Sequence, residues 1–324
     1  MADTLYAVLG ASGHVGGIIA ERLLGAKRRV RVGARHGDRL KGLAERGAEV
    51  VTGSIDDPAF LRRAFHGAGA AFVLLPPNFA PGIRAWQDRT AAAIGDALEA
   101  EKVERAVALS SIGADQAGGN GPIAGLHVLE RRLERIRGLF PLHLRPGYFF
   151  ENHLGSIGMI KGMGIAGSAL RGDLAMAQIA TRDIGEAAAR RLLALDWSGR
   201  TVHELQGQRD LTMAEVAAVL GKAIEKPDLK YVQFPLPGRR EGHGRRGAAA
   251  GDGGALRRDG EGVQRRPPEG DAAALRHDHH ADVDREVGVG VVRGGVQSRV
   301  SSRERCVVVV VVGPPPRLPP PFTP

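Results

Sequence analysis

Cysteine, aromatic side chains and long apolar runs are all scarce in this chain of 324 residues. The single cysteine, Cys306, excludes an internal disulfide framework and indicates a reducing compartment. The one apolar run late in the chain, Val307–Val312, is far too short to cross a bilayer. No basic region followed by a secretory apolar stretch opens the sequence. We therefore expect a cytoplasmic protein without membrane contact.

The net charge of +9 is spread along the chain rather than concentrated. Residues 1–235 carry 30 Lys and Arg against 25 Asp and Glu, and residues 236–324 carry 15 against 11. The few aromatic residues do not interleave with the arginines, as base-stacking platforms would. These features indicate a mildly basic surface and argue against a nucleic-acid partner.

The composition changes after Pro235. Residues 236–324 contain no Lys, Ile, Tyr, Asn, Met or Trp, but 15 Arg and 15 Gly. The missing residues have A/T-rich codons, whereas Arg, Gly, Ala and Pro have G/C-rich ones. One hypothesis is a G/C-rich gene read in a shifted frame, and the other is a genuine disordered Arg/Gly/Pro-rich tail. Both predict that residues 236–324 form no packed domain, and we assign no metal site to the histidines at 277–280.

Before Pro235, short β-branched runs alternate with longer amphipathic stretches. This alternation is typical of a parallel sheet with helices on both faces. It predicts an α/β fold with a Rossmann-type, doubly wound, mostly parallel sheet over residues 1–150 and a small C-terminal substrate lobe within 151–235. We expect Asp183 and Thr212 to cap two later helices. The predicted strands are Leu5–Leu9, Val30–Gly33, Glu49–Thr52, Ala70–Leu75, Arg105–Leu109 and Leu142–Arg145, and two earlier helices are predicted at Val15–Leu24 and Gln87–Glu101.

Three glycines, Gly10, Gly13 and Gly16, follow the first predicted strand and open the first predicted helix. In a dinucleotide fold, the first glycine permits a tight turn and the second lets the backbone approach a pyrophosphate. The third lets the helix lie close to the strand. The helix N-terminus then offers free N–H groups to the phosphates. A flexible turn is the alternative in a chain with 46 glycines, but the strand–turn–helix context favours a phosphate cradle.

The second predicted strand is followed by Arg35 rather than by an acidic residue. An acidic residue there would bind the ribose 2′-hydroxyl of NAD, whereas an arginine can pair with the 2′-phosphate of NADP. Arg39, one helical turn further, is a second candidate. The pattern favours NADP and leaves NAD possible. The alternative is a solvated arginine at a strand end.

Four motifs in order and at the expected spacing resemble the NmrA-like group of atypical short-chain dehydrogenases/reductases, from about residue 4 to 235. The resemblance implies a Rossmann core that binds NAD(P) and a small lobe forming the other wall of a cleft. The motifs are VLGASGHVG, VGARHGDRLKGL, RAVALSSIGA and PLHLRPGYFFEN.

The same resemblance implies cofactor contacts along the ends of the strands. Many relatives have an Asp where this chain has Ser54. Tyr148 and Phe149 would line the nicotinamide and substrate side, unless they belong to the ordinary core. The remaining implied contacts come from Ser12, His14 and Val15 at the pyrophosphate, Ser54 and Ile55 at the adenine, Leu75, Pro76 and Pro77 at the nicotinamide ribose, and Ser110 and Ser111 at the end of the fifth strand.

One family feature is missing from the helix that follows the fifth strand. Typical short-chain dehydrogenases carry Tyr-X-X-X-Lys there, and the lysine lowers the pKa of the tyrosine for proton transfer. Here the helix reads GLHVLERRLERI, without Tyr or Lys. His127 and Glu130 could replace the pair, although a surface i,i+3 pair is the favoured interpretation. The catalytic residues therefore stay unassigned, with His127 and Ser110 as candidates.

Two functions remain open from the sequence. The first is an NADPH-dependent reductase of a quinone-like or conjugated carbonyl compound, which could take protons from water. The second is a non-catalytic NADP(H)-sensing regulator that acts through a protein partner. The sequence does not identify the small-molecule substrate.

Overall fold

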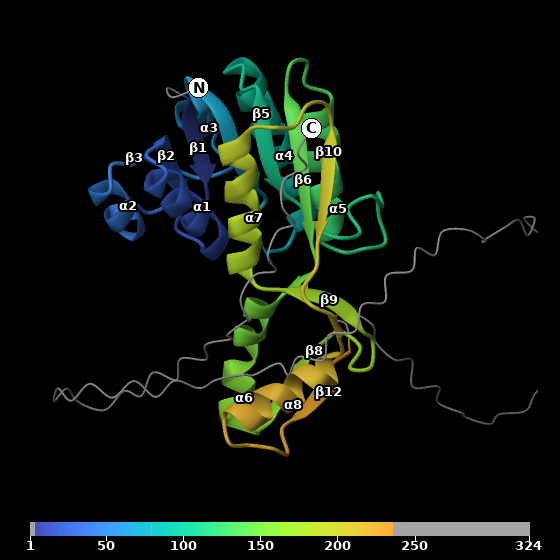
Figure 1. Cartoon of the computed structure of the whole chain (residues 1–324). Helices are drawn as coiled ribbons and strands as arrows, with labels where there is room; N and C mark the ends of the chain where they lie inside the picture. The colour runs from blue at the N-terminus through green and yellow to red at the C-terminus, as the bar shows by residue number, and fades with distance from the viewer. Residues whose placement is uncertain (1–3, 79, 236–324) are drawn as a thin grey trace, which may run out of the picture. The chain divides into compact units, whose positions relative to one another are not determined.

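The computed structural model describes residues 4–78 and 80–235, so the hypotheses about residues 236–324 lie outside the described residues. Its centre is a seven-stranded sheet in which every pair of neighbouring strands is parallel (Figure 1). The strand order is β10-β6-β5-β4-β1-β2-β3. The strands are β1 (Leu5–Leu9), β2 (Arg29–Ala34), β3 (Glu49–Thr52), β4 (Ala68–Leu74), β5 (Arg105–Leu109), β6 (Phe140–Pro146) and β10 (Thr201–Leu205).

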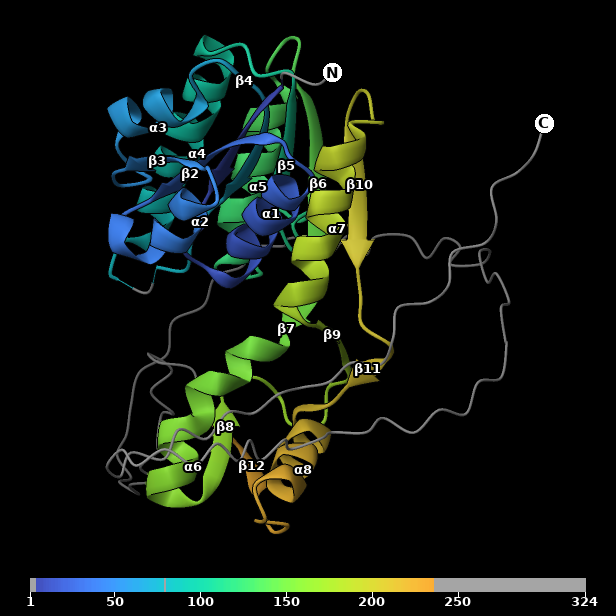
Figure 2. The same ribbon diagram turned by 60° about the vertical axis from the view of Figure 1, so that its left-hand side comes forward.

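Helices cover both faces of this sheet, because the central strands are apolar on both sides. In β1, Tyr6 and Val8 belong to one buried cluster, and Leu5, Ala7 and Leu9 belong to the other. Figure 2 shows the two helical layers on opposite sides of the sheet. The first layer contains α1 (His14–Gly25), α2 (Lys41–Glu45) and α7 (Thr181–Ala194), and the second contains α3 (Pro58–Phe65), α4 (Ile83–Ala100) and α5 (Ile123–Glu134).

This architecture confirms the predicted doubly wound α/β fold and all six predicted strands, with ends that differ by up to two residues. The seventh strand, β10, was not predicted. Its sequence TVHEL is only partly buried because it forms an edge of the sheet, where it pairs in register from Thr201 with Leu142 to Leu205 with Pro146. A half-exposed edge strand does not need the continuous apolar run that reveals a central strand.

A smaller lobe follows the end of β6. It contains a three-stranded sheet in the order β11-β9-β7 and a two-stranded parallel sheet of β12 and β8. No residue of α6 is buried, whereas α8 buries four. The elements are β7 (Tyr148–Phe149), α6 (Ile157–Met163), β8 (Ile165–Ser168), β9 (Met176–Ile179), β11 (Asp210–Leu211), α8 (Met213–Ala223) and β12 (Lys230–Gln233), and two 3-10 turns span Gly37–Leu40 and Phe150–Ser156.

The predicted cap of α8 is confirmed, and that of α7 is wrong. Thr212 and Glu215 form a reciprocal capping box, in which the Thr212 hydroxyl accepts from the Glu215 N–H at 3.1 Å and the Glu215 carboxylate accepts from the Thr212 N–H at 2.7 Å. Asp183, in contrast, lies inside the first turn of α7. The N–H of Thr181 donates instead to the carboxylate of Glu151, at 3.0 Å to each oxygen. A partner thirty residues away cannot be found from local sequence.

None of the helices within residues 4–78 and 80–235 combines the length and apolar character that spanning a bilayer would require.

Candidate functional site

The topology places the candidate site at the carboxyl ends of β1 and β4. These neighbouring strands lead in opposite directions across the sheet, because β1 connects to β2 on one side and β4 connects to β5 on the other. In open α/β sheets, ligands bind in the crevice at such a switch point. The glycine turn after β1 lies here, with Leu74 of β4 directly beside Gly10.

Two glycines of the turn, Gly10 and Gly16, could not be replaced by another residue without strain. Gly10 has a φ of +66°, and its N–H donates to the carbonyl of Gly33 in β2 at 2.9 Å. A Cβ on Gly16 would lie 2.5 Å from the carbonyl oxygen of Gly10. The start of α1 therefore lies against the end of β1, which is the packing that the third glycine of the motif provides.

The N-terminus of α1 is left open by the chain itself. Its N-cap residue is Gly13, no side chain accepts a hydrogen bond from the first turn, and that turn contains no acidic residue. Ser12, Gly13 and His14 are exposed. A Cβ on Gly13 would lie 3.3 Å from the Gly10 carbonyl oxygen, a tight contact, and would approach no other atom. Free backbone donors and the positive end of the helix dipole at this point suit an anionic diphosphate.

Two arginines stand beside this cradle at the end of β2. Arg35 directly follows the strand, Arg39 lies in the next turn, and both side chains are exposed. Neither forms an ion pair within residues 4–78 and 80–235, although Arg31 in the same strand pairs with Glu49 at 2.7 Å. The guanidinium groups of Arg35 and Arg39 are therefore available to a phosphate.

Ser54, at the end of β3, lies in a small polar group. Its hydroxyl donates to the Asp56 carboxylate, which also accepts from the indole N–H of Trp86 at 3.1 Å. The bond from Ser54 holds the pKa of Asp56 below its ordinary value, with Trp86 adding to the effect against burial. Ile55 packs its side chain partly against the core. The acidic group at this strand end is therefore supplied by Asp56, which the sequence analysis did not single out.

The remaining predicted contacts lie at the ends of β4, β5 and β6. Leu75 packs partly against the core and Pro77 is exposed. Ser111 gives its hydroxyl proton to the carbonyl of Ile112 at 3.0 Å. The others in this group are Pro76, which is half-buried after β4, Val15, whose side chain is buried in the core, and Tyr148 and Phe149, which form β7 and are half-buried.

Ser110, at the end of β5, belongs to a buried network that sequence reasoning missed. Its hydroxyl donates to the carboxylate of Glu130 in α5 at 2.5 Å. The guanidinium of Arg145, in β6, donates to both oxygens of the same carboxylate at 3.0 and 2.7 Å. Burial would raise the pKa of Glu130, but the bonds from Arg145 and Ser110 outweigh it and hold that pKa below its ordinary value.

This geometry changes the interpretation of the two candidate catalytic residues. The surface pair of His127 and Glu130 is wrong, since the Glu130 residue is 2% exposed and paired with Arg145. His127 Nδ1 lies 2.8 Å from the carbonyl oxygen of Ala114. Because a carbonyl only accepts, the Nδ1 of His127 carries a proton and donates to it. The hydroxyl of Ser110 already donates to Glu130, and Ser110 is only 5% exposed.

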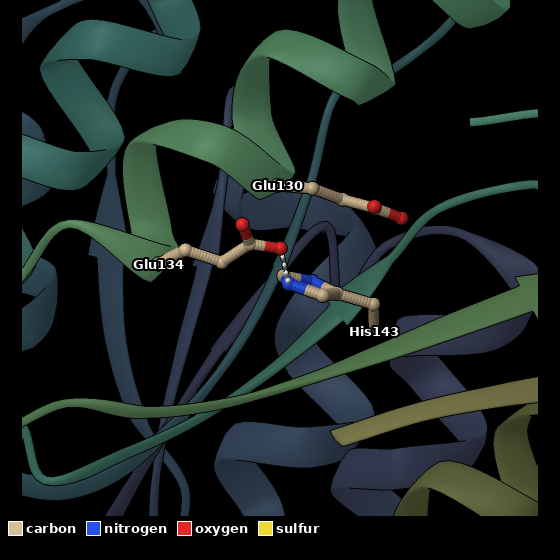
Figure 3. Close-up of side chains that lie close together, drawn as sticks. All are labelled: Glu130, Glu134 and His143. Carbon is tan, nitrogen blue, oxygen red and sulfur yellow. Dashed lines mark ion pairs between the residues drawn. The ribbon is translucent and has the colours of Figure 1, made fainter. Parts of the chain in front are cut away.

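A second histidine lies next to this network (Figure 3). His143 of β6 is fully buried, and its Nε2 lies 3.3 Å from the carboxylate of Glu134, one turn after Glu130 in α5. Burial lowers the pKa of His143, against the influence of Glu130 and Glu134. The three side chains resemble a metal-ligand set, but Arg145 pairs with Glu130 at 2.7 Å and Arg200 with Glu134 at 2.8 Å. The carboxylate charges are thus already balanced, and the cluster does not suit a cation.

Comparison with protein families agrees with the position of the cradle. Residues 10–135 match a family model described as NAD(P)H-binding. This match begins at the first glycine of the turn and ends after α5. The predicted use of a nicotinamide dinucleotide as cofactor is therefore confirmed at the level of the family.

A curated protein of Streptomyces griseus subsp. griseus, (4-alkanoyl-5-oxo-2,5-dihydrofuran-3-yl)methyl phosphate reductase, is 30% identical to this chain over 220 residues. The match covers 68% of this chain and 74% of that protein.

Solved structures with the same fold include two reductases and one regulator. An NADPH-dependent quinone oxidoreductase from Escherichia coli, in complex with NADPH, has a TM-score of 0.60 at 24% identity, covering 72% of this chain and 79% of that one. Triphenylmethane reductase from Citrobacter sp. in complex with NADP(H) has a TM-score of 0.59 at 19% identity, with 72% and 79% covered. The negative transcriptional regulator NmrA in complex with NADP has a TM-score of 0.59 at 16% identity, with 72% and 75% covered.

Proposed function

Because this chain belongs to the NmrA-like family of NAD(P)H-binding proteins, we propose that it is an NADPH-dependent reductase of a quinone-like or other conjugated carbonyl compound. The observation that carries the proposal is the open N-terminus of α1, where no side chain within residues 4–78 and 80–235 accepts from the first-turn N–H groups. A diphosphate accepts hydrogen bonds from such groups and is attracted by the helix dipole. The bound cofactor would supply hydride to the substrate.

Different residues of the chain would hold the two halves of the cofactor, one half on each side of the crevice. The N–H groups of Ser12 and of residues 14–16 hold the diphosphate, while that of Gly13 donates to the Gly10 carbonyl at 2.9 Å, and Arg35 pairs with the 2′-phosphate of the adenosine half. The nicotinamide half then extends along the ends of β4, β5 and β6, where Leu75, Ser111 and Tyr148 border it. Arg35 has no competing carboxylate within the described residues, which supports a preference for NADP over NAD.

The chemistry of one relative supports the substrate class. The name of the Streptomyces griseus protein describes a 5-oxo-2,5-dihydrofuran with an alkanoyl group at position 4. The ring double bond of such a compound is conjugated with both carbonyl groups, so it accepts hydride at carbon and places the charge on oxygen. Quinones share this property. We therefore propose an electron-poor conjugated carbonyl compound as the substrate.

Titration with NADP and NAD tests the cofactor assignment. In Arg35→Ala, the affinity for NADP should fall by about 1.5–3 kcal/mol while the affinity for NAD changes little, because a charge-assisted hydrogen bond to the 2′-phosphate is lost. An equal loss for both cofactors would exclude Arg35 from this role. Steady oxidation of NADPH with a panel of quinones and unsaturated ketones tests the activity itself.

A non-catalytic NADP(H) sensor is the second candidate. It is favoured by the commitment of the Ser110 hydroxyl to Glu130 and by the lack of Tyr and Lys on α5. Such a protein would bind NADP tightly without turnover, and its affinity for a partner protein would differ between NADP and NADPH. Turnover of NADPH with any member of the panel would exclude it.

A further inference from the structure

A tyrosine, Tyr148, lies at the strand ends that would border the nicotinamide half of the cofactor. Tyr148 begins β7 two residues after β6 ends, so it lies at the carboxyl end of that strand. Three strand steps separate β1 from β6, which corresponds to about 14 Å at ~4.8 Å per step. In a doubly wound fold, the second half of a dinucleotide lies on this side of the diphosphate.

Other hydroxyl and imidazole groups along these strand ends are hydrogen-bonded within the chain. The hydroxyl of Ser110 donates to Glu130, and that of Ser111 donates to the carbonyl of Ile112. The Nδ1 of His127 donates to the carbonyl of Ala114. The usual Tyr-X-X-X-Lys pair is not present on α5. Among the residues that the structure describes near these strand ends, Tyr148 of the lobe is the hydroxyl that forms no such bond to a carbonyl or carboxylate.

The Tyr148 hydroxyl does not donate its proton to another group of the chain. Burial raises the pKa of Tyr148, and the nearby side chain of Asn152 opposes this effect. Within the described part of the chain, no hydrogen bond is formed in which the Tyr148 hydroxyl is the donor. Its O–H proton is available to a ligand.

A fully buried glutamine fixes the ring that packs against Tyr148. The rings of Tyr148 and His153 lie 5.3 Å apart and are tilted by 56°. His153 Nε2 lies 2.8 Å from Oε1 of Gln178, whose amide nitrogen donates to the Leu211 carbonyl at 3.3 Å. Since this second bond sets the orientation of the amide, His153 Nε2 carries the proton and donates. Gln178 also pairs with Tyr148 in the β7–β9 ladder, so one buried residue positions both rings.

We propose that Tyr148 is the catalytic proton donor of this protein, with Asn152, His153 and Gln178 as positioning residues. The proposal rests on the proposed reductase function. It assigns to the lobe the proton transfer that related dehydrogenases perform with Tyr-X-X-X-Lys.

The step balances with the hydride that a reduced nicotinamide dinucleotide supplies. As a new C–H bond forms on the substrate, the electron pair of its conjugated double bond moves to the carbonyl oxygen. The O–H bond of Tyr148 breaks and a new O–H bond forms on that oxygen. Water then returns a proton to the tyrosinate. The substrate is reduced by two electrons and the nicotinamide is oxidised by two.

The electrostatics of Tyr148 support a role as acid rather than base. Burial raises the pKa of Tyr148, the neighbouring Tyr231 adds to this effect, and Asn152 opposes it. The hydroxyl is therefore protonated at neutral pH and can donate during reduction. Burial also lowers the pKa of His153, so the imidazole beside it is neutral.

The test compares Tyr148→Phe with Tyr231→Phe in the full-length protein. Tyr231 is a matched control, because its hydroxyl bonds to Leu170 and Ser168 within the lobe. With 2-cyclohexen-1-one and NADPH, Tyr148→Phe should lower kcat/KM at least ~100-fold, a typical effect of removing a general acid. Tyr231→Phe should stay within about threefold of the parent, and both variants should bind NADPH with a Kd within about twofold.

A second readout needs no turnover. The infrared carbonyl band of 2-cyclohexen-1-one, bound together with NADP⁺, should lie at lower frequency in the parent and in Tyr231→Phe than in Tyr148→Phe, because only the first two donate to that oxygen. Equal rates and equal bands in parent and Tyr148→Phe would overturn the proposal and leave the reductase function standing. A parent that does not oxidise NADPH with this ketone or with quinones would overturn the reductase function itself, and the role of Tyr148 with it.

Discussion

The polar groups at the two halves of the carboxyl edge of the sheet differ in whether the chain itself satisfies their hydrogen bonds. At the β1–α1 end, the chain leaves the N–H groups of a helix N-terminus without any side-chain acceptor. At the β5–α5 end, Ser110, Glu130 and Arg145 satisfy one another in a buried network. An open donor set is stable only where water or a ligand can reach it, whereas a closed network has little left to offer a ligand. The comparison predicts that the cofactor diphosphate binds at the first half and that the Ser110–Glu130–Arg145 network itself is structural.

A second comparison sharpens the first, since α1 and α7 share the same face of the sheet. The N-terminus of α7 receives the carboxylate of Glu151, which accepts from both the N–H and the hydroxyl of Thr181. Among the described residues, none provides a carboxylate to the N-terminus of α1. The chain thus caps α7 with its own anion, and the proposed diphosphate would take the same place at α1.

The largest effect on stability is expected from disrupting the buried network of Ser110, Glu130 and Arg145. Glu130→Gln removes the charge that faces Arg145, whose side chain is 9% exposed, and should lower the free energy of unfolding by about 3–5 kcal/mol. The matched control is Glu186→Gln, whose partner Arg22 is 60% exposed, and it should cost less than ~1 kcal/mol. Chemical denaturation gives both values. Similar losses in the two variants would show that the buried Glu130–Arg145 pair contributes no more to stability than the exposed Glu186–Arg22 pair.

The next largest effect is expected on NADPH binding at the N-terminus of α1. Gly13→Val places a side chain over the turn at a φ of −99°, which any residue can adopt, although its Cβ lies 3.3 Å from the Gly10 carbonyl oxygen. NADPH binding should weaken at least ~30-fold, or about 2 kcal/mol, and the free energy of unfolding should fall by about 1 kcal/mol, because valine is a poorer N-cap than glycine. Gly25→Val, at the other end of α1, meets open space and should bind NADPH like the parent. Calorimetric titration with NADPH distinguishes the two variants. Normal NADPH binding by Gly13→Val would show that the diphosphate does not bind at this turn.

A smaller effect is expected at the capped helix. Glu151→Ala should lower the free energy of unfolding by about 1–2 kcal/mol, because Thr181 loses its acceptor at the start of α7. Glu151→Gln keeps an acceptor oxygen and should lose less than half of that amount. Neither variant should change the Kd for NADPH. Thermal denaturation and titration together check this prediction, and a weaker Kd in Glu151→Gln would contradict the separation of the two helix ends.

The smallest effect is a change in acid stability. Since the pKa of His143 is lowered in the folded protein, the unfolded chain binds a proton first as the pH falls below about 6.5. The stability that neutral His143 contributes is therefore present above that pH and is lost as the pH falls through the folded pKa. The groups around the imidazole are Glu130, Glu134, Arg145 and Arg200. His143→Gln should flatten the decline below pH 6.5, measured by chemical denaturation across this pH range.

The fold could be predicted from sequence because its central strands are buried on both faces and appear as continuous apolar runs. Arg105–Leu109 was predicted with its observed ends for this reason. The edge strand β10 has no such run and was missed. The glycine turn was predicted because its function depends on local backbone geometry, which leaves a local signal.

The contacts that close the second half join residues far apart in the chain, and no local pattern reveals them. Arg145 pairs with Glu130 fifteen positions earlier, and Glu151 reaches Thr181 thirty positions later. One signal was available for the first pair. Glu130 lies between Leu129 and Leu133, which face the core, so a charge at that position needed a buried partner.

Hydrogen exchange at individual amides tests the central comparison most directly, because the two helix ends report from the same sample. Saturation with NADP⁺ should slow the exchange of the amides of Ser12 and residues 14–16 at least ~10-fold, while the amides of Thr181 and Arg182 change less than about twofold. Unchanged exchange at Ser12 and residues 14–16, or equal slowing at both helix ends, would contradict the account.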